Sequence, residues 1–172
     1  MRSGAYNTKI QRLPQTLIHE RADRDGDGLA RVIGLLIRDQ SGNTDMLPLS
    51  SERKQIVIDV DCIQDVLLAG VAVAVLTGER NRVLWMNSSD QIESCRLSRG
   101  RHRITLDLRG GVSPPPGDYY LNVALMGSEG MLDYIADAHK FTITDGDFFG
   151  SGRFPDTAPA VFVEHDWKIE LI

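Results

Sequence analysis

The stretch "GVAVAVL" at residues 70–76 decides the fold. Its valines alternate with two alanines, Ala72 and Ala74. Alternation with a period of two is typical of a β-strand, whose successive side chains point to opposite faces of a sheet. The pattern predicts a strand at 69–77 with its valines facing a core and its alanines facing outward.

The stretch "PPPGDYYLNVALM" at residues 114–126 follows the same rule and predicts a second strand at 118–126. Alternation assigns an inner row of Tyr119, Leu121, Val123 and Leu125, and an outer row of Tyr120, Asn122, Ala124 and Met126. Because Tyr119 comes shortly after a Pro-Gly turn, we expect a corner tyrosine whose hydroxyl bonds back to the backbone.

Outward from these two stretches, other short apolar runs alternate with clusters of Gly, Pro, Asn and Ser. No segment keeps an apolar period of 3.6 residues over three turns. We predict further strands at 29–38, 54–62, 82–87, 103–109, 132–143 and 160–170. The pattern favours an all-β fold, an immunoglobulin-like antiparallel β-sandwich of seven to eight strands. Residues 1–27 are interpreted as a linker or partly ordered arm, and 28–172 as the sandwich.

Composition narrows the class of protein. The 172 residues carry a formal charge of -5, which argues against a general nucleic-acid binder. No apolar run approaches the ~18 residues of a membrane span, and the first residues lack the apolar core of a signal peptide. Cys62 and Cys95 show no metal-ligand spacing and are expected to be reduced thiols. These features predict a cytoplasmic location.

Sequence motifs for catalysis or cofactor binding are not found. There is no phosphate-binding loop, no dinucleotide fingerprint and no zinc or nucleophile motif. The stretch "DRDGDG" at 23–28 begins like a calcium loop, but Gly34 stands where the bidentate Glu is needed. We interpret it as a polar turn before the first strand. We expect no enzyme activity, no catalytic residue, no metal and no cofactor.

The two central strands predict a flat outer face of alanines. A face built only for solubility would carry Lys, Glu and Thr, so we expect a ligand, another strand or a second subunit to cover it. If Leu84 points inward, Trp85 points outward beside Tyr120 and Asn122. Aromatic rings pack on sugar C–H groups, and amides bond hydroxyls. The predicted carbohydrate contacts are Trp85, Asn87, Tyr120, Asn122 and Arg101.

Alternative interpretations remain for two of these contacts. Trp85 could lie in the core or beneath another strand. Arg101 belongs to "RLSRGRHR" at 96–103, which could hold an anionic group but could equally be a solvated hairpin end.

The order of motifs along residues 26–167 resembles the C-terminal domain of Wzt-type ATP-binding subunits of bacterial O-antigen ABC exporters. The matching segments are "GDGLARVIGLLIRDQSG", "GVAVAVLTGERNRVLWMNSSD", "RITLDL", "PPPGDYYLNVALM", "HKFTITDGDFFGSGRF" and "VFVEHDW". No single segment is diagnostic; their order, and the tail "DGDFFGSG…W" in particular, carries the resemblance.

The resemblance implies a non-catalytic sandwich that binds the non-reducing end of an undecaprenyl-linked O-polysaccharide in the cytoplasm and presents it for export. It also implies a homodimer with an exchanged C-terminal strand, an ATP-binding domain and a membrane permease as partners. The chain departs from the family in two ways. The ATP-binding domain is absent from this sequence, and the family usually has a small residue where Trp85 stands.

A second function is compatible with the same pattern. The flat face could be filled by a partner strand in a protein-interaction or dimerisation sandwich without sugar binding. A buried Trp85 would favour this alternative.

Overall fold

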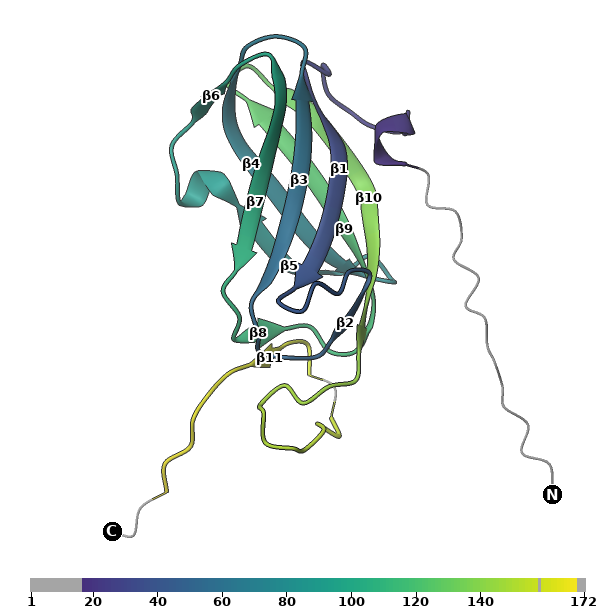
Figure 1. Cartoon of the computed structure of the whole chain (residues 1–172), viewed down its shortest axis with the longest axis vertical. Helices are drawn as coiled ribbons and strands as arrows, with labels where there is room; N and C mark the ends of the chain where they lie inside the picture. Colours follow the sequence, from purple (N-terminus) through teal and green to yellow (C-terminus); the bar gives the residue numbers. More distant parts are fainter. Residues whose placement is uncertain (1–16, 158, 170–172) are drawn as a thin grey trace, which may run out of the picture.

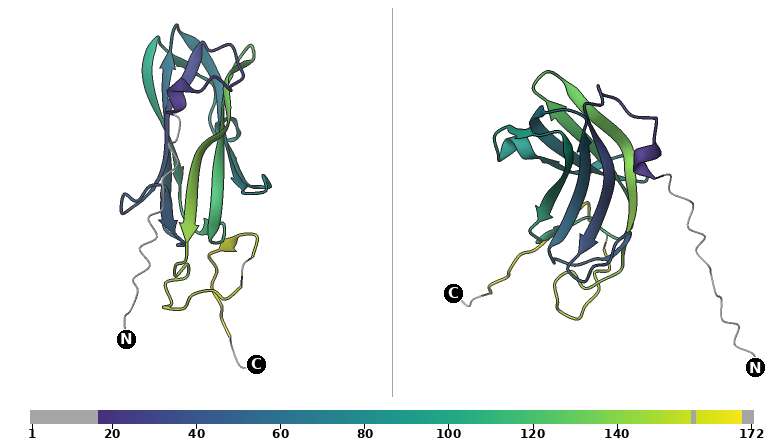
Figure 2. Two further views of the ribbon diagram at one scale, coloured as in Figure 1. Left: turned by 90° about the vertical axis from the view of Figure 1, so that its right-hand side faces the viewer. Right: turned by 45° about the horizontal axis from the view of Figure 1, so that its top comes forward.

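Two β-sheets pack face to face in the computed structural model, which describes residues 17–157 and 159–169 (Figures 1 and 2). The smaller sheet has the order β1 (Ala30–Asp39), β3 (Lys54–Cys62), β7 (Gly100–Leu108). The larger sheet has the order β2 (Met46–Pro48), β10 (Met131–Thr144), β9 (Gly117–Gly127), β4 (Val66–Thr77), β5 (Arg82–Asn87), with β6 (Cys95–Leu97) also paired to β4. The predicted immunoglobulin-like β-sandwich is confirmed.

Short elements complete the fold. β8 (Val112–Ser113) pairs with β11 (Phe162–Val163) at one end of the sandwich. Single 3-10 turns, η1 (Ile18–Glu20) and η2 (Ser88–Asp90), precede β1 and follow β5. β2 runs parallel to β10, whereas the other strand pairs of the described residues are antiparallel.

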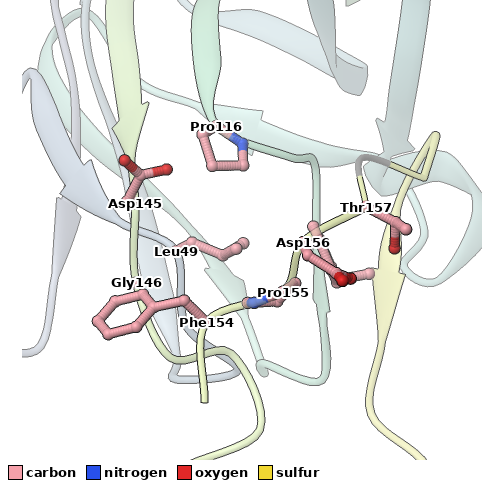
Figure 3. A pocket seen from close by; sticks show the side chains of 9 residues that line it. Leu49, Pro116, Asp145, Gly146, Phe154, Pro155, Asp156 and Thr157 are labelled. Atoms are coloured by element: carbon pink, nitrogen blue, oxygen red, sulfur yellow. The ribbon is translucent and has the colours of Figure 1, made fainter. Parts of the chain in front are cut away.

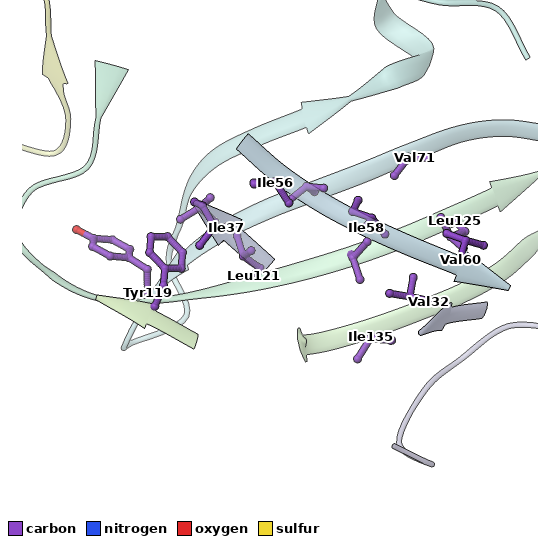
Figure 4. Packing of buried hydrophobic residues seen from close by; sticks show 14 of the residues in the cluster. Val32, Ile37, Ile56, Ile58, Val60, Val71, Tyr119, Leu121, Leu125 and Ile135 are labelled. Atoms are coloured by element: carbon purple, nitrogen blue, oxygen red, sulfur yellow. The ribbon is translucent and has the colours of Figure 1, made fainter. Parts of the chain in front are cut away.

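The core lies between the sheets, and the period-two pattern accounts for it. The three valines of "GVAVAVL" and the inner row of β9 are buried, and they meet Ile56, Ile58 and Val60 of β3 (Figure 4). Burying each such side chain contributes roughly 1.5–3 kcal/mol. The Tyr119 hydroxyl donates to the Pro115 carbonyl at 2.7 Å, which confirms the corner tyrosine, and burial raises the pKa of Tyr119.

One predicted strand is wrong. Of the predicted strand 160–170, the structure describes residues 160–169, and within these only Phe162–Val163 form a strand. Its partner strand ends at Ser113, because Pro114 has no N–H to donate. At the other end, Gly110 and Gly111 have φ of 94° and 75° and turn the backbone out of line. The paired residues therefore end at Val163 and Val112. Glu164 still donates its N–H to the Gly111 carbonyl at 2.7 Å, and the chain then leaves the sandwich (Figure 1).

Candidate functional site

A hollow opens on the outer face of the larger sheet. Ala72, Ala74 and Ala124 form its floor and are only 2%, 4% and 8% exposed, although they point away from the core. Ala74 pairs with Trp85 on one side and Asn122 on the other. The volume is about 230 Å³, and the lining residues are Ala72, Ala74, Leu76, Arg82, Trp85, Asn122, Val123, Ala124, Met126, Met131 and Tyr134. We call this the alanine hollow.

Trp85 forms one wall of the alanine hollow. It lies on β5 and is 50% exposed, whereas its neighbour Leu84 packs against the core. The predicted outward orientation is confirmed. The guanidinium carbon of Arg82 lies 4.7 Å from the centroid of the Trp85 ring, so one face of the indole is stacked with a cation.

Asn122 has both ends of its amide engaged. Its Oδ1 accepts from the backbone N–H of Asp137 at 2.8 Å, and its Nδ2 donates to the Tyr134 hydroxyl at 3.2 Å. Asp137 lies where the register between β9 and β10 shifts, and it has φ of 49°. Asn122 therefore holds this bulge in place and supports Tyr134 at the rim of the hollow.

Tyr120 lies on the same outer face, beyond the lining of the hollow. Arg80 stacks on its ring at 3.9 Å and pairs with Asp137 at 2.9 Å. Lys140 lies 5.9 Å from the same ring and pairs with Asp118 at 2.8 Å. This pairing raises the pKa of Lys140 and lowers that of Asp118.

A second, larger groove lies beyond Tyr120, between the arm and the facing edges of β1 and β10. It has a volume of about 760 Å³, and Tyr120, Asp137, His139 and Lys140 contribute to its lining. His139 Nε2 lies 3.2 Å from the Asp45 carboxylate. Burial lowers the pKa of His139, and Asp45 opposes that shift.

The other two predicted residues lie apart from the hollow. Asn87 is on the same face, next to Ala72, but its side chain accepts from the Ser89 backbone N–H and caps η2. Arg101 lies on β7, in the opposite sheet, beside Asp61 of β3. The structure thus brings Trp85 and Asn122 into the hollow, with Tyr120 beside it, and separates Arg101 from them.

Sequence reasoning did not predict that four further residues gather around one site. These are Tyr134, Arg82, Met126 and Met131. Tyr134 lies within the predicted strand 132–143, so alternation could have placed it outward. The pairing of Tyr134 with Ala124, however, depends on the register of two strands that are separated by a turn. That register is not encoded in either segment alone.

The arm before β1 is fastened to both sheets. Arg24 donates to both carboxylate oxygens of Asp133 on β10 and to the Val32 carbonyl on β1. Asp133 also accepts from the Val32 backbone N–H at 2.8 Å. Of the predicted arm, residues 1–16 lie outside the described residues. The division of the chain at residue 27 stays a prediction.

"DRDGDG" was predicted to be a polar turn, but it runs alongside β10, with a bend at Gly26 and with the N–H groups of Asp27 and Gly28 donating to the carbonyls of Met131 and Leu132. Asp23 bonds the Arg21 guanidinium, which lowers the pKa of Asp23 to about 2. Asp27 accepts from the Leu29 backbone N–H, and Asp25 forms a backbone bridge with Tyr134. Within residues 17–157 and 159–169, no three His, Cys, Asp or Glu side chains are grouped to hold a metal ion.

Another hollow of about 220 Å³ lies at the end of the sandwich near β8 and β11 (Figure 3). Its walls come from strand ends and from the C-terminal segment, and include Leu49, Pro116, Asp145, Phe154 and Asp156. None of the predicted site residues lines it. In the described part of the chain, no helix is both long and apolar enough to cross a bilayer.

Comparison with known proteins gives a structural match. No family model matches the chain, and no curated protein matches it either. The crystal structure of the C-terminal domain of Wzt is similar, with a TM-score of 0.66 and 18% sequence identity over 88% of this chain and 90% of that one. This match confirms, at the level of the fold, the resemblance seen in the sequence.

A more distant match is the X-ray structure of the Northeast Structural Genomics Consortium target SoR45. Its TM-score is 0.41 and its identity 13%, over 85% of this chain and 100% of that one. No functional argument rests on it.

Proposed function

We propose that this chain is a non-catalytic carbohydrate-binding domain that recognises O-antigen polysaccharide for an ABC exporter. The observation that carries the proposal is the alanine hollow with Trp85 as its wall. A low apolar floor lets a sugar ring approach the sheet, and the exposed part of the indole offers a surface for its C–H groups. The fold shared with the C-terminal domain of Wzt supports the same assignment.

The size of the hollow fits one end of a glycan. At about 230 Å³ it is smaller than the roughly 300–1,000 Å³ of a typical small-molecule pocket. A single sugar unit of the non-reducing end occupies it, and further units of the chain lie across Tyr120 toward β10. A shallow contact of this kind binds weakly, with a Kd of about 10 µM to 1 mM, corresponding to roughly 4–7 kcal/mol.

The partners follow from the same proposal. The ligand is an undecaprenyl-linked O-polysaccharide, and the domain works in the cytoplasm with an ATP-binding domain and, through it, a membrane permease. A homodimer with exchanged C-terminal strands is supported by the exposed apolar residues after β11, because Trp167 is 83% and Ile169 94% exposed. Two sites in one dimer would raise the apparent affinity by avidity.

The same exposed residues favour a second candidate function. A dimerisation or protein-interaction sandwich would use the C-terminal segment, and the flat face, to add a strand from a partner.

The proposal is tested by titrating the purified domain with the O-polysaccharide of its own host, alongside a mismatched glycan. NMR shifts report the residues affected, and light scattering reports the mass in solution. The chain has only two tryptophans, so a Trp167→Phe variant leaves Trp85 as a single fluorescent reporter in the hollow.

We expect saturable binding of the matched glycan only. Trp85→Ala should abolish binding while the melting temperature stays nearly unchanged, because Trp85 is half exposed. Loss of the fold in Trp85→Ala would instead assign this residue a structural role. A well-folded dimer that binds no glycan would favour the interaction module.

A further inference from the structure

The polar groups of the alanine hollow are almost entirely hydrogen-bond donors. Four polar side chains line it, namely Arg82, Trp85, Asn122 and Tyr134. Arginine and the tryptophan indole can only donate. No Asp or Glu is among the lining residues.

The two remaining polar side chains, Asn122 and Tyr134, do not offer a ligand a strong hydrogen-bond acceptor. The backbone N–H of Asp137 fixes the orientation of the Asn122 amide, because only the oxygen can accept from it. Nδ2 of Asn122 therefore faces the Tyr134 hydroxyl and donates to it. A tyrosine hydroxyl that accepts in this way is left with its own O–H to donate.

Arg82 differs from the other cations of this face. Arg80 pairs with Asp137 and Lys140 with Asp118, so these charges are already balanced. Among the described residues no carboxylate lies within ion-pair distance of Arg82, and its side chain is exposed over Trp85. A planar guanidinium that stacks on a ring keeps its N–H groups directed outward along its edge.

We propose that the alanine hollow is selective for an anionic group on the glycan, a sugar carboxylate or a phosphate ester. This inference rests on the proposed function and adds its chemical class of ligand. A neutral sugar presents hydroxyls that need acceptors as well as donors, whereas an anion only accepts. Arg82 binds the anion, and the Tyr134 hydroxyl donates to it or to a neighbouring ring oxygen.

The test is binding to an array of bacterial polysaccharides grouped as neutral, uronic-acid-containing and phosphate-containing. The unaltered domain is compared with Arg82→Gln and with Arg31→Gln. Arg31 is an exposed arginine on β1 of the opposite sheet, so its variant makes the same charge change away from the hollow. Melting temperatures of all three proteins check the fold.

The expected result is binding to one or both acidic groups, weakened about tenfold or more in Arg82→Gln because a charge-assisted hydrogen bond is lost, and kept in Arg31→Gln. The two acidic groups distinguish carboxylate from phosphate. Equal binding of neutral polysaccharides, or no effect of Arg82→Gln, overturns the anion selectivity and leaves the proposed function standing. Binding to no polysaccharide overturns both.

Discussion

The two outer faces of the sandwich are built on the same strand periodicity but end in opposite surfaces. On the smaller sheet, long charged side chains pair across strands, as Arg103 does with Asp59 at 2.7 Å and Arg53 with Asp107 at 3.6 Å. On the larger sheet, three alanines are nearly buried, although no strand or helix of the described residues packs over them. The difference teaches that small residues on an outer face, walled by aromatic rings, leave a hollow in the sheet surface that longer side chains would fill.

The largest expected effect on stability comes from comparing a buried with an exposed arginine–aspartate pair. Arg24 and Asp133 are 6% and 2% exposed, whereas Arg103 and Asp59 on the charged face are 67% and 34% exposed. Arg24→Met should cost about 3–5 kcal/mol of unfolding free energy, because it leaves a buried carboxylate unpaired. Arg103→Met should leave the denaturation midpoint nearly unchanged. Equal urea midpoints for the two variants would contradict the expectation that the buried pair contributes more to stability than the exposed pair.

The same glutamate introduced on each face is the next test. Ala74→Glu places a long charged side chain on the floor of the alanine hollow and should cost roughly 1–3 kcal/mol by overpacking, while abolishing glycan binding. Thr105 of β7 lies on the charged face, and Thr105→Glu should change the free energy of unfolding by no more than about 0.5 kcal/mol. Thermal unfolding together with glycan titration measures both. A stable, glycan-binding Ala74→Glu variant would mean that the hollow is not the site.

An amide comparison comes next, because its expected effect on stability is no larger. Asn122→Ala removes the acceptor of the Asp137 N–H and should cost about 1–3 kcal/mol, since a partly buried donor is left unsatisfied. Gln55→Ala removes an exposed contact with Arg38 and should change stability little. Hydrogen exchange of the Asp137 amide should rise only in Asn122→Ala. Unchanged protection of the Asp137 amide would show that the bulge keeps its conformation without the Asn122 side chain.

The smallest effect is a pH dependence on the charged face. The Arg103 guanidinium lowers the pKa of Asp59. The pair therefore stabilises the fold above the unfolded-state pKa of about 3.9, and this contribution is lost as the pH falls through the lower folded-state value. NMR titration of Asp59 should show its pKa rising toward the ordinary value in Arg103→Gln. The same pKa in both proteins would mean that the cross-strand contact does not persist in solution.

Local alternation was enough to predict what lies within one strand, and this covers most of the fold. It placed Val73 inside and Trp85 outside, and the Pro-Gly turn before Tyr119 identified the corner hydroxyl. It did not place residues that depend on sheet order. Arg101 was grouped with Trp85 as part of the basic stretch at 96–103 that could hold an anionic group, yet β7 joins the opposite sheet.

Pairing partners explain the other misses. Tyr134 reaches the hollow through its register with Ala124, and a bulge lies further along the same pair of strands. The apolar alternation after residue 160 is typical of a strand, but a strand also needs a neighbour. Here the neighbour is limited by a proline on one side and a glycine turn on the other.

The contacts of Arg24 have a mechanical consequence. The side chain bonds β10 of one sheet and β1 of the other, and Arg21 adds a bond to the Asp137 carbonyl on β10, so a pull on the arm at residue 17 is divided between the two sheets. Because β10 also carries Tyr134 at the rim of the alanine hollow, a force on the arm is transmitted to a strand that lines the hollow.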